Sequence, residues 1–169
     1  MGLDVSYYSA AKFERDNSDA DYDGYDDDFV RTYVNKDFPG RADDIVTGWY
    51  STGDGDCLPS MGYGEYNAWR EELAKLAGWA PGSYHEYGRD WPSHAASAWA
   101  ATEGPFWELI LFTDCDGIIG PKTSAKLAKD FADHQGKADA HSDEDFRQKY
   151  SLFRTAFETA SHGGLVSFH

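Results

Sequence analysis

The chain has 169 residues, 15 of them basic and 30 acidic, so its formal net charge is −15. This length suits one compact domain, and 41% hydrophobic with 27% charged residues is typical of a globular protein. The acid excess argues against a general nucleic-acid-binding surface. No apolar run approaches the roughly 18 residues of a membrane span, and the N-terminus lacks the basic and apolar regions of a secretory signal.

The first part of the chain predicts three strands and an acidic loop. In residues 3–8, Leu3, Val5 and Tyr7 fall on one face and the side chains between them on the other, which is the period-two pattern of a strand. Residues 29–34 and 45–50 predict two further strands, the last ending before the glycines at 53 and 55. Between them, the segment 14–28 contains eight acidic residues and one arginine without hydrophobic periodicity. We expect this segment to be a loop.

The rest of the chain predicts mainly helices. Residues 65–77 carry apolar side chains at helical spacing and stop at Gly78, a residue that favours helix C-termini. Residues 78–104 predict mostly loop, with a short helix at 94–101. The range 106–112 fits either a helix or a buried strand, because periodicity does not separate the two. A further helix is predicted from Pro121 to about residue 134.

The strongest amphipathic pattern precedes the C-terminus. Ser142 and Asp145 resemble a capping box at the start of a helix over 143–161. Its apolar stripe consists of Phe146, Tyr150, Phe153, Phe157 and Ala160. A short strand at 165–168 follows. The order of elements indicates a single α+β domain over 1–169, whose small antiparallel sheet pairs the N- and C-terminal strands and packs against several helices.

A candidate ligand site precedes the helix at 65–77. Gly62 and Gly64 permit close approach of a ligand to the main chain, while Tyr63 and Tyr66 offer rings on which a flat ligand can stack. Arg70 lies one turn further along the helix and reaches an anion. The predicted wall also includes the adjacent Trp49 and Tyr50. The alternative is that these rings belong to the hydrophobic core.

Two other places suit an anion. Lys122 and Thr123 lie at a predicted helix N-terminus, where free N–H groups and the helix dipole favour negative charge. The spacing is not that of a phosphate-binding P-loop, and an ordinary helix start is the alternative. Arg41 follows a Pro-Gly turn and would bind a carboxylate or phosphate. We prefer its pairing with Asp43 or with the acidic loop.

The acidic loop contains half of a calcium-binding pattern. Asp19, Asp21 and Asp23 alternate and are followed by Gly24, as in the first half of a calcium loop. Val30 stands where the closing bidentate glutamate should be, and Asp27 or Asp28 is the available substitute; a solvated acidic loop is the alternative. No other cofactor is indicated.

The cysteines and histidines show no recognisable catalytic or metal-binding spacing. Cys57 and Cys115 are too few for a disulfide framework, and each lies beside carboxylates that disfavour a thiolate. A catalytic cysteine also needs a histidine partner, which the sequence does not locate. We therefore expect both cysteines to be poor nucleophiles.

Several segments together carry a resemblance to a known family. They are GLDVSYYS at 2–9, DFPGRAD at 37–43, YNAWREELAKLAG at 66–78, GPFWELILFTDCDGIIGP at 104–121, SAKLAKDFAD at 124–133 and GGLVSFH at 163–169. The chain resembles small hypothetical proteins encoded by tailed phages and prophages, with the loops 14–28 and 79–103 as variable parts. The resemblance implies a phage accessory protein in the cytoplasm of a bacterial host, and it transfers no catalytic residue.

These observations favour a binding protein without catalysis. We expect it to counter bacterial defence by sequestering a nucleotide-derived immune signal, so that its partner is a small nucleotide-like ligand. One alternative is an acidic inhibitor that binds a host defence protein directly, including by imitating DNA. Another is a metal-dependent hydrolase that uses the Asp-rich loops. No membrane partner is expected.

Overall fold

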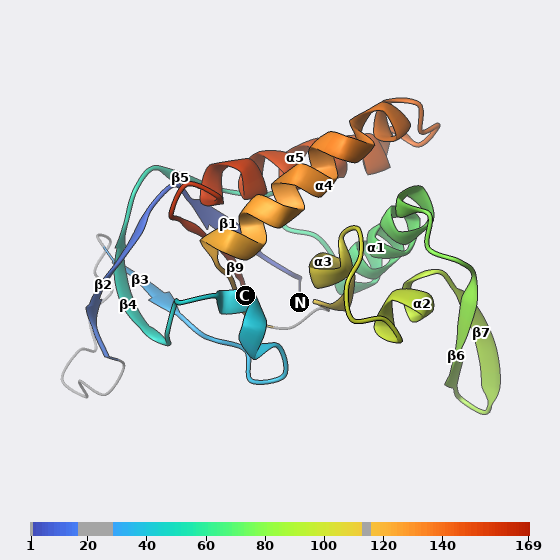
Figure 1. The fold of residues 1–169 in the computed structure, drawn as a ribbon, viewed down its shortest axis with the longest axis horizontal. Helices are drawn as coiled ribbons and strands as arrows, with labels where there is room; N and C mark the ends of the chain where they lie inside the picture. Colours follow the sequence, from blue (N-terminus) through green and yellow to red (C-terminus); the bar gives the residue numbers. More distant parts are fainter. Residues whose placement is uncertain (1, 17–28, 113–115) are drawn as a thin grey trace.

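The N- and C-terminal strands lie side by side in the central sheet (Figure 1). The computed structural model describes residues 2–16, 29–112 and 116–169. β1 (Val5–Tyr8) pairs antiparallel with β9 (Leu165–Phe168), and the sheet order is β5 (Gly55–Cys57), β1, β9 and β8 (Gly117–Ile119). The expected α+β fold with paired terminal strands is confirmed.

Two smaller sheets flank the central one at opposite ends of the long axis (Figure 1). At one end lies an antiparallel sheet in the order β2 (Ala11–Arg15), β4 (Gly48–Thr52) and β3 (Phe29–Thr32). At the other end, β6 (Gly82–Glu86) and β7 (Arg89–Ser93) form a projecting hairpin. Tyr87 and Gly88 form its turn, with φ of 52° and 76°, as a tight two-residue hairpin loop requires.

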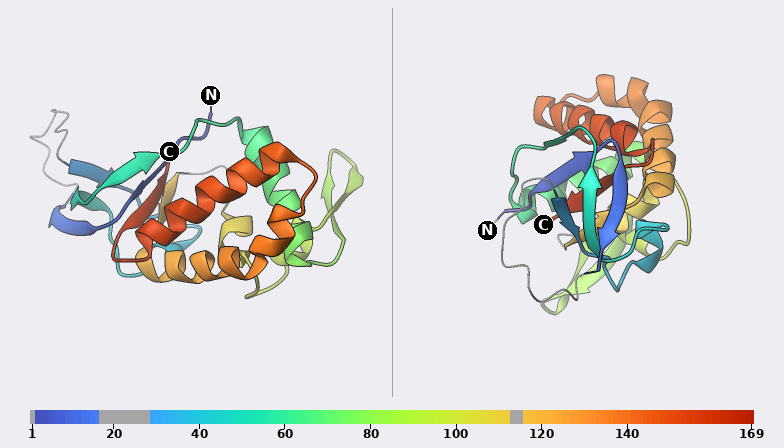
Figure 2. Two further views of the ribbon diagram at one scale, coloured as in Figure 1. Left: turned by 90° about the horizontal axis from the view of Figure 1, so that it is seen from above. Right: turned by 90° about the vertical axis from the view of Figure 1, so that its left-hand side faces the viewer.

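Helices cover the central sheet and join it to the hairpin. The helical elements are η1 (Pro39–Ala42), α1 (Tyr63–Ala77), α2 (Ala95–Trp99), α3 (Trp107–Leu111), α4 (Pro121–Asp139) and α5 (Glu144–Ala160). α4 and α5 pack along each other beside the central sheet, as Figure 2 shows. α1, α2 and α3 lie between this pair and the hairpin.

The α5 stripe forms the centre of the hydrophobic core, as predicted. All five of its predicted residues are buried, and Phe153 has no exposed surface. The Phe153 ring stacks on Trp69 of α1 with the ring centroids 4.5 Å apart. Tyr66 of α1 and Phe168 of β9 belong to the same cluster. The core therefore joins α1, α5 and the central sheet.

Several predicted elements differ from the observed ones. Residues 106–112 contain the short helix α3, which decides between the two alternatives. The α5 N-cap is Asp143, whose carboxylate accepts from the N–H groups of Asp145 and Phe146, so the predicted cap was displaced by one residue. The loop predicted at 78–104 contains the β6–β7 hairpin, and β2, β5 and β8 were not predicted. These strands are short and gain their order from neighbouring strands.

Replacing Phe153 with alanine is expected to destabilise the fold by about 3–5 kcal/mol, because it leaves a cavity between α1 and α5. Denaturant titration of the purified protein measures this loss. Leu152→Ala is the matched control, since Leu152 is adjacent in α5 but 37% exposed, and its effect should be much smaller. Equal stabilities for the two variants would contradict the assigned core face.

Candidate ligand-binding cleft

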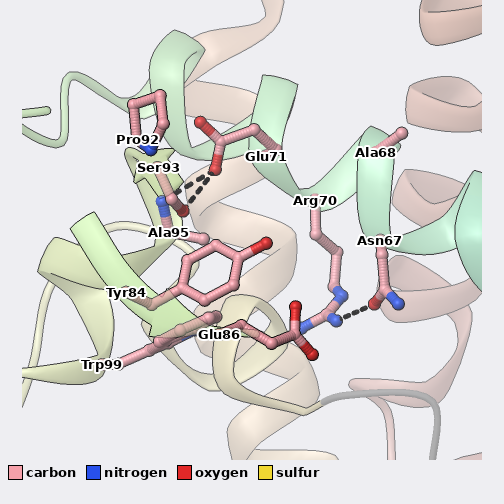
Figure 3. Close-up of a pocket in the computed structure, with 10 residues that line it drawn as sticks. All are labelled: Asn67, Ala68, Arg70, Glu71, Tyr84, Glu86, Pro92, Ser93, Ala95 and Trp99. Atoms are coloured by element: carbon pink, nitrogen blue, oxygen red, sulfur yellow. Dashed lines mark hydrogen bonds between the residues drawn. The ribbon is translucent and has the colours of Figure 1, made fainter. Parts of the chain in front are cut away.

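A cleft of about 460 Å³ opens between α1, α2 and the β6–β7 hairpin (Figure 3). Helix α1 supplies one wall, and the hairpin and α2 supply the other. The lining residues are Asn67, Ala68, Arg70, Glu71, Tyr84, Glu86, Pro92, Ser93, Ala95 and Trp99. The set combines two aromatic rings with a buried arginine and a few polar groups, the usual make-up of a small-molecule site.

The Glu71 carboxylate holds the two walls together. It accepts hydrogen bonds from Ser93 Oγ at 2.8 Å, from the backbone N–H groups of His94 and Ala95 at 2.8 and 3.1 Å, and from His94 Nδ1 at 3.0 Å. Burial alone raises the pKa of Glu71, but these bonds outweigh it and lower the pKa to about 2. Glu71 therefore remains ionised and fixes the start of α2 against α1.

Two aromatic rings meet in the wall opposite α1. Tyr84 of β6 and Trp99 of α2 are tilted by 54°, with their ring centroids 5.5 Å apart. Trp99 is 45% exposed and Tyr84 is partly exposed. Figure 3 shows the two rings next to each other, with the Glu86 side chain extending from β6, the strand that also carries Tyr84. A flat ligand in this cleft would therefore find exposed ring surface.

Arg70 lies on the α1 side of the cleft and is only 5% exposed. Its Nη1 donates to the Ile110 carbonyl at 2.5 Å, and its Nη2 donates to Asn67 Oδ1. The guanidinium also lies 4.9 Å from the centre of the Tyr66 ring. Among the described residues, no acceptor meets its buried Nε–H group. Arg70 is thus a fixed cation with one unmatched donor beside the cleft.

The structure separates the other residues of the predicted α1 site. Tyr66 is fully buried, and its hydroxyl donates to the Phe112 carbonyl at 3.1 Å, so it is a core residue. Tyr63 begins α1 and packs, half-buried, against the same core. Neither lines the cleft, although Arg70 does. The alternative assignment of these rings to the core describes their positions better.

Trp49 and Tyr50 lie on β4, at the far end of the molecule from α1 (Figure 1). Tyr50 is buried, and its hydroxyl bonds to the Val46 backbone. The Trp49 ring has the guanidinium carbons of Arg15 and Arg31 5.5 and 5.8 Å from its centre. The predicted wall that combined these residues with α1 is therefore not formed.

Arg41 is buried and does not pair with Asp43. Its guanidinium lies 4.2 Å from the centre of the Trp107 ring, and its Nε donates to the Glu108 carbonyl at 3.2 Å. Burial lowers the pKa of Arg41, and the charge of Glu108 partly offsets this effect. Arg41 therefore links η1 to α3 through internal contacts.

The N-terminus of α4 binds an anionic group, and that group is the side chain of Asp43. The Asp43 carboxylate accepts from the N–H groups of Lys122 and Thr123 at 2.7 and 3.0 Å, and from the Thr123 hydroxyl at 2.9 Å. The Lys122 ammonium pairs with Asp44. The helix N-terminus thus binds negative charge, as the dipole argument requires, with an internal side chain as the ligand.

The predicted calcium ligands Asp19, Asp21 and Asp23 lie outside the described residues. Within residues 2–16, 29–112 and 116–169, no three His, Cys, Asp or Glu side chains gather in a way that would hold a metal ion. In the same ranges, no helix combines the length and apolar character needed to cross a bilayer.

Comparison of the chain with protein-family models, with curated proteins and with solved structures finds no match in any of the three. Evidence about function therefore comes from the chain's own residues and their geometry.

Sequence reasoning missed most of the cleft. Of the residues that line it, only Arg70 was predicted to bind a ligand. Trp99 falls in the short helix predicted at 94–101, which forms as α2, but Tyr84 falls in the segment predicted as loop, so nothing indicated that the two rings would meet. The Tyr87-Gly88 pair was the available signal for a hairpin turn, and Tyr is an unusual residue at positive φ.

The hydrogen bonds that Glu71 accepts from Ser93, His94 and Ala95 are called the clamp below. Replacing Glu71 with glutamine should weaken this clamp and reduce the dependence of the free energy of unfolding on pH. Because the folded-state pKa of Glu71 is depressed to about 2 from its ordinary value of 4.5, its contribution is present above about pH 4.5 and is lost as pH falls toward 2. The shift corresponds to about 3 kcal/mol. Denaturant titrations from pH 7 to acid measure it.

Glu72→Gln is the matched control for the clamp. Glu72 is the next residue of α1, and it makes partly exposed ion pairs with Lys75 and, at 3.9 Å, with His141, each worth about 0–1 kcal/mol. The difference between parent and Glu71→Gln should shrink in acid, while the control follows the parent throughout. A constant difference across the pH range would contradict the role given to the Glu71 charge.

Replacing Asp43 with alanine should destabilise the protein by about 0.5–2 kcal/mol, because α4 loses its N-terminal acceptor. Asp44→Ala removes only the exposed pair with Lys122 and should cost less. Thermal unfolding of the two variants at one pH compares them. A larger loss for Asp44→Ala would show that the Asp43 cap has been overvalued.

Proposed function

We propose that this protein captures a small, flat, anionic ligand in the cleft between α1, α2 and the β6–β7 hairpin and releases it unchanged. The observation that carries the proposal is the position of Arg70, a buried cation that lines the cleft, across from the rings of Tyr84 and Trp99. Nucleotides combine a flat base with an anionic group and fit this arrangement best.

The aromatic pair supports recognition of a base. Stacking of one base on an aromatic side chain is worth about 1–3 kcal/mol in proteins that bind single strands. Trp99 comes from α2, which Glu71 fixes to α1 together with β7, and Tyr84 comes from β6, which pairs with β7. A ring that is already held in place loses less side-chain entropy when a ligand binds.

The polar groups of the cleft favour an anionic group near Arg70 and hydrogen-bond donors elsewhere. The Arg70 guanidinium places a positive charge beside the cleft, which would attract a phosphate or carboxylate. The Glu71 carboxylate is already occupied by four donors. Glu86 is exposed and would accept from an amino group, such as those on the edges of several nucleobases.

The biological role that we propose follows from the phage resemblance of the sequence. In that setting the captured ligand is a nucleotide-derived signal of bacterial defence, and sequestering it protects the phage. The net charge of −15 opposes the approach of any anion. The cleft must therefore overcome this repulsion through its local contacts.

Intrinsic tryptophan fluorescence and calorimetry with a panel of ribonucleoside monophosphates, triphosphates and cyclic dinucleotides test the proposal. At least one should bind with a Kd in the micromolar range, which corresponds to about 8 kcal/mol. Trp99→Ala and Tyr84→Ala should each weaken binding by about tenfold or more, as loss of one stacking contact predicts. The binding of these two variants is followed by calorimetry.

Tyr87→Ala is the matched control, because Tyr87 is 88% exposed at the tip of the same hairpin and does not line the cleft. Mass analysis of the released nucleotide separates capture from catalysis: an intact ligand supports capture, and an altered one supports the hydrolase alternative. Absence of binding across the panel, together with a stable complex with a host protein, would replace capture by direct inhibition.

A further inference from the structure

A second cleft, of about 220 Å³, lies where the central sheet faces β3. Ser6, Tyr8, Ser167 and His169 line it from the central sheet side, and Arg31 and Tyr33 line it from the β3 side. It is distinct from the cleft beside α1 and shares none of its residues. A chain of hydrogen bonds leads from this cleft to an exposed cysteine.

The chain consists of Cys57, Ser6 and His169. Ser6 Oγ lies 3.3 Å from Cys57 Sγ and 3.1 Å from His169 Nε2. Both distances are within hydrogen-bonding range for their atoms. A single hydroxyl therefore connects a thiol to an imidazole, which is the histidine partner that the sequence did not locate.

Strand register places these groups on one face of the central sheet. Ser6 of β1 is paired with Cys57 of β5 on one side and with Ser167 of β9 on the other. Paired residues in adjacent strands project to the same face. Asp56 pairs with Tyr7 instead, so its side chain belongs to the opposite face. The Asp56 carboxylate nevertheless remains close to Cys57, because it accepts a hydrogen bond from the Cys57 backbone N–H at 2.8 Å.

The chain of hydrogen bonds has a fixed centre and two open ends. Ser6 is 5% exposed, whereas Cys57 and His169 are exposed. The His169 backbone is held by two hydrogen bonds to Asp4, with N–O distances of 2.8 and 2.9 Å. An exposed thiol is accessible to a reagent, and an exposed imidazole can return a proton to water.

We propose that Cys57 is a nucleophilic thiol that reacts with low-molecular-weight disulfides, and that Ser6 and His169 accept its proton. The thiol proton passes to Ser6 Oγ while the Ser6 hydroxyl proton passes to His169 Nε2. The resulting thiolate attacks one sulfur of the disulfide, forms a new S–S bond and expels the other half as a thiolate. Cys57 is thereby oxidised to a mixed disulfide, and the small disulfide is reduced to one free thiol.

Other charged and titratable groups surround this relay. Burial and the charge of Cys57 raise the pKa of Tyr8, while a hydrogen bond with Ser6 lowers it. Burial, Asp56 and Cys57 raise the pKa of Tyr7. Arg31 of β3 and Asp116 beside β8 line the adjacent cleft. The negative groups oppose a thiolate, so the imidazolium formed on His169 is needed to stabilise it.

Single-turnover reaction with an aromatic disulfide that releases a coloured thiol tests the proposal. The Cys115→Ser background leaves Cys57 as the single thiol, because the chain has 2 cysteines. At neutral pH, Ser6→Ala and His169→Gln should each slow the reaction by about tenfold, since an ordinary thiol is only a few per cent ionised there. Their rates should approach the parent's in alkaline buffer, where hydroxide replaces the relay as the base.

Ser60→Ala is the matched control, because Ser60 is an exposed serine three residues from Cys57 and does not line this cleft. It should react at the parent's rate. Circular dichroism establishes that each variant is folded, and mass analysis locates the mixed disulfide on Cys57. Reaction of Ser6→Ala and His169→Gln at the parent's rate, or no reaction of the parent at neutral pH, would overturn the proposal.

Discussion

The Glu71 carboxylate holds β7 and α2 against α1, and the cleft beside α1 depends on it. It accepts from one hydroxyl, two backbone N–H groups and one imidazole, so its charge is surrounded by donors from the opposite wall. A hairpin of two strands has little stability alone. The clamp gives this hairpin and a helix of one turn a fixed position, which allows Tyr84 and Trp99 to face the cleft.

The acid excess also determines where an anionic ligand would bind. The α4 N-terminus is occupied by Asp43, Lys126 pairs with Glu108 and Asp130, and Lys149 pairs with Glu65 and Asp145. These internal pairs satisfy cationic sites that would otherwise attract phosphate. Arg70 differs because one of its buried donors has no acceptor among the described residues.

The sequence predicts the large elements of this fold better than its site. The α5 stripe, the Gly78 stop of α1 and the alternation in β1 are local patterns, and each of these elements forms as expected. The hairpin, β5 and β8 are short, and strand pairing stabilises them. No local pattern shows that Asp43 reaches Thr123, or that Ser6 lies between Cys57 and His169, because those contacts join residues more than 50 positions apart in the chain.

The same difference between local patterns and long-range contacts explains why Arg70 alone of the predicted binding residues lines the cleft. One helix contains Tyr63, Tyr66 and Arg70, so the sequence indicates their spacing. Which face of that helix is buried depends on contacts with α5 and β9. Tyr66 packs in the hydrophobic core, whereas Arg70 lines the cleft. The residue types of Trp49 and Tyr50 suggest that they belong to the same site, but strand pairing places both in the β2–β4–β3 sheet.

Photolabelling with an azido-adenine nucleotide, followed by peptide mapping, tests the central claim most directly. If the cleft beside α1 is the ligand site, the label should appear in peptides that contain Tyr84 or Trp99, and excess unmodified nucleotide should prevent it. Competable labelling confined to the cleft that contains Ser6 and His169, or to the β2–β4–β3 sheet, would contradict the account.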